Sequence, residues 1–227
     1  MAAPPLRYEL ARIGQFQAHL PLPVSALLGL AAFAAVILSE LWSAAKHVDA
    51  IAHEGSHAIV GAACGRRVLG VRMFRNGDGA TRLHPPTGLG YIVAGIAGYL
   101  GPSGFGLAAA ELIQMRHSVA VLWFALALLL ILLVPLRFGF GVASVTVTGL
   151  VIYLIARYAS LGMQEAAAYV LAWLLLLTGV DTVLKHGTKA VDAGVLNQLT
   201  RLPRGFWHSL WLAGSLFALV VGARLLL

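Results

Sequence analysis

Long apolar stretches alternate with short polar segments along this chain. A helix needs about 20 residues to cross the hydrocarbon layer of a bilayer, and several stretches reach or approach that length. The expected helices cover residues 24–41, 48–65, 89–113, 119–136, 138–156, 166–184 and 207–227. The second of these is short and the others are long. The pattern therefore predicts an all-α, multi-pass membrane protein with about six long transmembrane helices and one short additional helix.

The segment of residues 66–87 has a different pattern. Residues 68–74 alternate between apolar and polar side chains, residues 76–79 read Asn-Gly-Asp-Gly, and residues 80–83 can return as a second strand. Such a turn sequence between two short strands predicts a β-hairpin, with Asp78 in its turn. The hairpin either pairs its edge with an extended peptide or serves as a solvated connector.

Composition narrows the class of protein. Hydrophobic residues make up 59% of the 227 residues and charged residues only 11%, far from the balance of a soluble domain. We expect one integral membrane domain over residues 1–227, in which residues 1–22 form a polar cytoplasmic lead-in. The only cysteine excludes an internal disulfide and a cysteine-based zinc site.

The distribution of positive charge predicts an orientation in the cell membrane. The formal net charge is +7, and basic residues favour the cytoplasmic face. With seven crossings and a cytoplasmic N-terminus, only Lys46, Arg116, Arg157 and Arg224 fall outside. The basic loops would face anionic lipids of the bilayer. Because no nucleic-acid-binding motif accompanies this charge, we expect no nucleic-acid partner.

The strongest chemical signal is the sequence His53-Glu54-Gly55-Ser56-His57 in the short second helix. Two histidines four residues apart lie on one helix face and can bind one metal ion, while Glu54 can act as a general base. The alternative is an amphipathic turn whose histidines face loops or headgroups. The apolar neighbours argue against that alternative, because ionisable groups in such surroundings usually have partners. We therefore predict a Zn²⁺ site.

A zinc site of this kind needs a third protein ligand. Asp181 is the first candidate, because it is the one charged residue in a long apolar stretch and ligation would offset the cost of burying it. Asp192 is the second candidate, with a helix cap as its alternative role. Asp181 lies on the order of 9 Å from the depth of the histidine pair at helical rise, so a helix break at Gly179 would be needed. Asp49, one turn before His53, is in reach to orient that imidazole.

The stretch of residues 88–106 is rich in glycine. Glycines allow two helices to approach closely, so this stretch is expected to pack against the helix that carries the histidines. A second possibility is that it forms a corridor in which a substrate backbone comes near the metal.

Several of these motifs resemble the site-2 protease superfamily of intramembrane zinc metalloproteases. His53-Glu54-Gly55-Ser56-His57-Ala58 followed by Cys64-Gly65-Arg66-Arg67-Val68 is similar to its H-E-x-G-H-A motif and the strand-bearing loop after it. The segments Ala97-Gly98-Tyr99-Leu100-Gly101-Pro102 and Asp192-Ala193…Leu199-Thr200…Pro203…Trp207 look more like its compact peptidase M50B-like branch. The resemblance covers most of the chain from about residue 23 onward.

The resemblance implies zinc ligation by His53, His57 and an aspartate on a later membrane helix, which by position is Asp181. Two departures accompany it: Ser56 stands where glycine is usual, and Val180-Asp181-Thr182 stands where Leu-Asp-Gly would be expected.

The expected function is hydrolysis of peptide bonds in membrane-embedded protein substrates, with Glu54 as the catalytic base. Two other classes of function stay open. One is a catalytically inactive relative that binds membrane helices, and the other is a membrane protein that handles metals or other ions.

Overall fold

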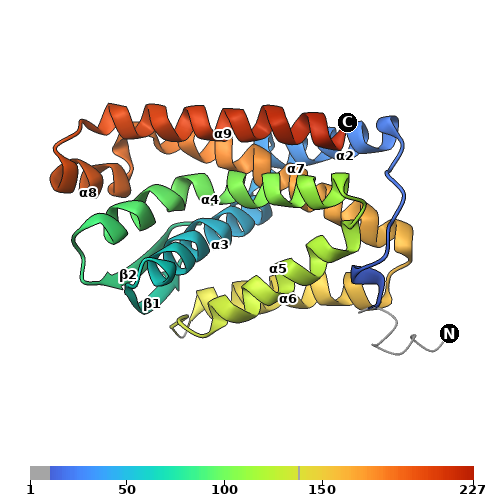
Figure 1. The fold of residues 1–227 in the computed structure, drawn as a ribbon, viewed down its shortest axis with the longest axis horizontal. Coiled ribbons are helices and arrows are strands. Elements are labelled where there is room, and N and C mark those ends of the chain that lie inside the picture. The colour runs from blue at the N-terminus through green and yellow to red at the C-terminus, as the bar shows by residue number, and fades with distance from the viewer. Residues whose placement is uncertain (1–10, 138) are drawn as a thin grey trace.

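The protein is a bundle of helices with one small β-hairpin at one end (Figure 1). The computed structural model describes residues 11–137 and 139–227, without the side chains of residues 39–44 and 187. Most of the predicted lead-in, residues 1–10, and the expected helix start at Phe138 therefore lie outside the described residues. The helices are α2 (Leu22–Ile37), α3 (Ser39–Ala63), α4 (Leu89–Gln114), α5 (Ser118–Leu133), α6 (Phe140–Tyr158), α7 (Leu161–His186), α8 (Val191–Thr200) and α9 (Arg204–Leu226), with a 3-10 turn η1 (Gly187–Lys189).

Within the described residues, four helices are long and apolar enough to cross a membrane, namely α4, α6, α7 and α9. The apolar helices α2 and α5 have 16 residues each, which is short for a straight crossing. The expected count of about six long spans is thus not confirmed by the described residues. Helix α5 ends at Leu133 rather than at residue 136, because Pro135 has no N–H to continue the helical hydrogen bonds and its ring crowds the preceding turn. The chain is nonetheless an apolar, multi-pass helical protein.

The helix that carries the histidine pair is not short. Helix α3 spans 25 residues, from Ser39 to Ala63, because the chain leaves the helical conformation only at Leu38 (φ −82°, ψ 124°) and resumes it at once. The sequence prediction placed this boundary several residues later, between two separate helices. The polar residues of α3 keep it out of the set of apolar spans.

Helices α2 and α3 run in the same direction along α7. The Leu20 N–H donates to the Tyr169 hydroxyl, Gly29 packs against Trp173, and the Thr182 hydroxyl donates to Asp49. As the residue number rises from 20 to 49 through α2 and α3, the number of the contacted residue rises from 169 to 182 along α7. The two helices together make one passage along the bundle rather than two.

Both ends of the described chain consequently lie at the same end of the bundle. The Ser25 hydroxyl donates to the carbonyl of Leu226 at 2.7 Å, and the Gln17 N–H donates to the carbonyl of Arg116 at 2.7 Å. The hairpin and α8 lie at the opposite end (Figure 1). These contacts do not fit seven crossings, which would separate the first helix from the C-terminus, nor a lead-in on the same face as the hairpin.

The hairpin predicted from the sequence is present. Strands β1 (Arg67–Met73) and β2 (Gly79–His84) pair antiparallel, and the turn between them contains an Asn76 Nδ2 to Asp78 Oδ2 hydrogen bond of 2.6 Å. The outer edge of β1 is occupied, because Val71 N–H donates to Pro135 and Arg137 N–H donates to Val71. The hairpin is therefore fixed to the segment between α5 and α6.

Helix α4 lies at the centre and packs against α3, α7 and α9. Its glycines make this packing possible: a Cβ added at Gly101 would clash with the Ser56 hydroxyl, and one at Gly106 would lie 2.8 Å from the Leu176 nitrogen. The expected packing of the glycine-rich stretch against the helix that carries the histidines is confirmed.

Candidate metal centre

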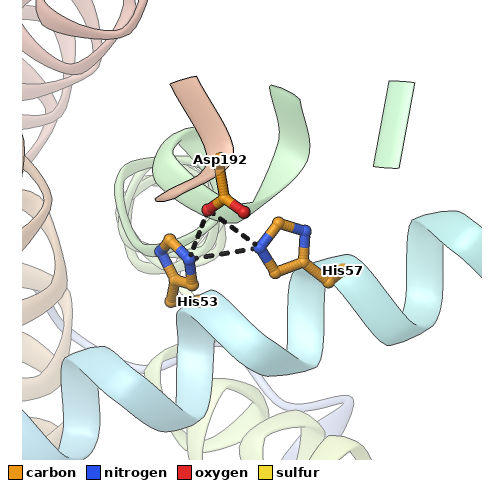
Figure 2. Close-up of side chains that lie close together, drawn as sticks. All are labelled: His53, His57 and Asp192. Atoms are coloured by element: carbon orange, nitrogen blue, oxygen red, sulfur yellow. Dashed lines mark hydrogen bonds and ion pairs between the residues drawn. The ribbon is translucent and has the colours of Figure 1, made fainter. Parts of the chain in front are cut away.

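His53 and His57 point from one face of α3 toward Asp192 of α8 (Figure 2). Their Nε2 atoms are 3.2 Å apart, and Asp192 Oδ2 lies 3.3 Å from His53 Nε2 and 3.4 Å from His57 Nε2. Among the described residues this is the one group of three such side chains whose ligand atoms all lie close together. Three donor atoms from two separate helices thus converge on one point.

The size of this triangle fits a zinc ion. Ligand atoms at 2.0–2.2 Å from a tetrahedral zinc are about 3.3 Å from one another, which matches all three measured distances. Two imidazoles and one carboxylate are also a ligand set typical of catalytic zinc, which leaves a fourth position for a reactant. The residues present therefore could hold a zinc ion.

His57 is held in the tautomer that ligation requires. Its Nδ1 lies 2.7 Å from the carbonyl oxygen of Ala94, and a carbonyl can only accept, so the proton is on Nδ1. That bond leaves the Nε2 lone pair directed at the centre and fixes the ring plane. His53 is held differently, by the edge-on ring of Tyr99 at 4.7 Å, which in turn stacks on Trp211 at 4.4 Å.

Asp192 lies in the first turn of α8, which the turn η1 folds back toward the bundle. Burial raises the pKa of its carboxyl, but the contacts with the His53 and His57 rings, and their positive charge when they are protonated, outweigh burial and leave the pKa below its ordinary value. The group is therefore an ionised carboxylate at neutral pH, the form that binds metal. Its alternative role as a helix cap is not observed, since Ala190 is the cap residue of α8.

Asp181 is not in this group. Its carboxylate pairs with Lys185, one turn later in α7, at 2.6 Å. The sequence prediction expected a metal to partner this carboxylate in an apolar helix, whereas in the structure its partner is Lys185. Helix α7 continues unbroken past Gly179, which packs against Ser103 of α4, so the break needed to bring Asp181 to the histidines does not occur.

Asp49 is buried and lies on the same helix face as His53. Its Oδ2 accepts a 2.7 Å hydrogen bond from the Thr182 hydroxyl, while no partner of its Oδ1 is found among the described residues. The contact ties α3 to α7 immediately beside the candidate metal ligands. The expected contact between Asp49 and the His53 ring is not among the hydrogen bonds described.

Glu54 lies next to His53 and is 4% exposed. It lines a cavity of about 640 Å³ together with both histidines and Asp192. Strand β2 forms another wall of that cavity, through residues 79–81 and Leu83. The cavity therefore joins the candidate metal ligands, the candidate base and strand β2.

The comparison with protein families matches residues 26–222 to the family described as Peptidase M50B-like. The chain belongs to this family. The match covers nearly the whole helical bundle, including α3, the hairpin and α8. A search of curated proteins found no significant match, and neither did a search of solved structures.

Proposed function

We propose that this protein is a zinc-dependent intramembrane metallopeptidase that cleaves membrane-embedded protein substrates. The observation that carries the proposal is the triangle of His53, His57 and Asp192, whose sides of 3.2–3.4 Å suit a tetrahedral zinc, with Glu54 beside it. Membership of the Peptidase M50B-like family supports the same reaction class.

Each residue of the centre has a role in this chemistry. His53, His57 and Asp192 would hold the zinc, and Asp192 replaces Asp181 in that role. A bound zinc ion supplies Lewis acidity, which polarises the scissile carbonyl and lowers the pKa of the attacking water. Glu54 takes the proton of that water as it attacks the carbonyl carbon, and then gives a proton to the departing amine nitrogen.

The cavity favours a substrate in an extended conformation. Strand β2 lines the cavity, and its outer edge has no backbone hydrogen bond to any described residue beyond β1. An unwound segment can pair with such an edge, which exposes the carbonyl groups that a regular helix would hide. The histidines lie near Ala94 and Gly98, so by helical rise the centre is about 8–14 Å along α4 from its start at Leu89.

The distribution of charge supports a cytoplasmic location for the hairpin end. Most of the described basic residues lie in or against the hairpin, in η1, or at the helix ends next to it and to α8, namely Lys46, Arg66, Arg67, Arg72, Arg75, Arg82, Arg137, Lys185, Lys189, Arg201 and Arg204. Arg12, Arg116, Arg157 and Arg224 lie at the other end. By the positive-inside rule the catalytic centre faces the cytoplasm, and both ends of the described chain face the opposite side.

The decisive experiment compares the wild type with Glu54→Gln in liposomes. The probes are fluorogenic single-span peptides with glycine and proline in the span, and bound zinc is measured in parallel. A peptidase cleaves at least one peptide, and Glu54→Gln loses cleavage by at least about 100-fold while it retains zinc. Zinc binding without cleavage by the wild type would instead favour a peptide-binding relative. Rapid exchange of the zinc with the medium, again without cleavage, would favour an ion-handling protein.

A further inference from the structure

One side chain of the hairpin contacts the candidate base. Thr81 Oγ1 lies 2.6 Å from Glu54 Oε2 and 3.2 Å from the Glu54 carbonyl oxygen. The hydroxyl has one proton to donate. It donates it to the carboxylate oxygen Oε2, which is closer and is the stronger acceptor. Hydrogen bonds from a hydroxyl to a carboxylate of this length are charge-assisted and about twice as strong as neutral ones.

The hairpin also encloses the carboxylate sterically. A Cβ added at Gly79 would lie 2.5 Å from both Glu54 Cγ and Oε1, so the backbone of β2 rests directly on the Glu54 side chain. No other hydrogen bond to the Glu54 carboxylate is found among the described residues. The orientation of Glu54 thus depends on β2 rather than on its own helix.

The position of Thr81 is itself fixed. Thr81 faces Val71 in the register of the two strands, and Val71 is fully buried. Val71 is bonded on its other edge to Pro135 and Arg137. The Thr81 hydroxyl is therefore carried by a strand that is anchored to the bundle, not by a free loop.

We propose that Thr81 is a positioning residue for Glu54. Its hydroxyl holds Oε2 while the backbone at Gly79 encloses Oε1, and together they fix the carboxylate that takes the proton of the attacking water. The inference rests on the proposed peptidase function. It assigns β2 two roles, because the strand whose open edge can pair with a substrate also orients the base that activates water for the attack.

The test compares Thr81→Val, which keeps the shape and removes the hydroxyl, with Thr81→Ser, which keeps the hydroxyl. In liposomes, on a fluorogenic span peptide that the wild type cleaves, Thr81→Val should lower kcat by about 10- to 100-fold, the value of a hydrogen bond to a charged group. KM and bound zinc should not change, and Thr81→Ser should restore most of kcat. Arg82→Gln is the matched control, because successive side chains of a strand point to opposite faces and Arg82 is exposed.

A second measurement does not depend on activity. In the metal-free protein, Thr81→Val and Glu54→Ala should shift the midpoint of thermal unfolding non-additively, because each removes the same hydrogen bond. Additive shifts, or an unchanged kcat in Thr81→Val, would overturn this inference while Glu54→Gln still tests the peptidase itself. Absence of cleavage by the wild type would overturn both, and loss of zinc in Thr81→Val would show a merely structural role.

Discussion

At the scale of single residues, the candidate metal centre depends on a glycine as much as on the three side chains that could bind the metal. A Cβ at Gly98 would clash with His57 Nε2 and lie 3.0 Å from His53 Nε2, so the absence of a side chain there leaves room for an ion between the imidazoles. Neither glycine content nor helical periodicity distinguishes this glycine from its neighbours in the sequence.

Gly98→Ala should abolish zinc binding, because the added methyl group occupies the space beside both Nε2 atoms. Gly104→Ala in the same helix is the matched control, since nothing lies within 4 Å of its added Cβ. Alanine should stabilise the helix at that position by up to about 1 kcal/mol. Zinc content of the purified proteins is the measurement, and stoichiometric zinc in Gly98→Ala would contradict the geometry.

Zinc affinity also distinguishes between Asp192 and Asp181 as the third ligand. Asp192→Asn should weaken zinc binding by more than about 100-fold, because it replaces a charged ligand and ligands matter more than the groups that orient them. Asp181→Asn should leave the affinity within about twofold and cost at most about 1 kcal/mol through its pair with Lys185. Competition with a chelator measures both affinities. A larger loss of zinc affinity in Asp181→Asn than in Asp192→Asn would instead identify Asp181 as the ligand.

At the scale of elements, the sequence predicted correctly those structures that depend on a few neighbouring residues. The Asn-Gly-Asp-Gly turn and the alternation around it predicted the hairpin, because turn chemistry and pleating are properties of a few neighbouring residues. The boundary between α2 and α3 was not predicted, because Leu38 and its neighbours contain no proline or glycine to mark a break.

The junction of α3 and α7 gives a prediction at this scale. Thr182→Val removes the 2.7 Å hydrogen bond to the buried Asp49 carboxylate, so unfolding should become easier by about 1.5–3 kcal/mol. Thr146→Val, at an exposed position of α6, should have little effect. Thermal unfolding in detergent measures both. In the Asp49→Asn background the cost of Thr182→Val should fall, and an undiminished cost would argue that the hydroxyl acts elsewhere.

At the scale of the whole molecule, the direction of α2 and α3 changes the membrane arrangement. Because both helices run along α7 in the same sense, the first helix and the C-terminus meet at one end, as the Ser25 contact with Leu226 shows. The centre and its hairpin then lie at the basic end of the molecule.

Cys64, the only cysteine and an exposed one, reports on this arrangement. In intact cells a membrane-impermeant maleimide should label Cys64 only after permeabilisation, because it lies at the hairpin end. In a Cys64→Ser background, Ser160→Cys should be labelled without permeabilisation, because residue 160 joins α6 and α7 at the opposite end. Equal labelling of both positions would contradict the arrangement, and reversed labelling would contradict the orientation.

The sequence by itself determined the membrane-protein class, the hairpin and three residues of the candidate centre, His53, Glu54 and His57. These follow from composition and from spacings within one helix turn, which hold in any tertiary context. Only the tertiary structure decided the third residue of the candidate centre, the space beside Gly98 and the shared end of the two described chain ends. Each of these depends on how far a helix continues and where the chain reverses: α7 continues past Gly179, so Asp181 stays with Lys185, and the turn at η1 brings Asp192 back to the histidines.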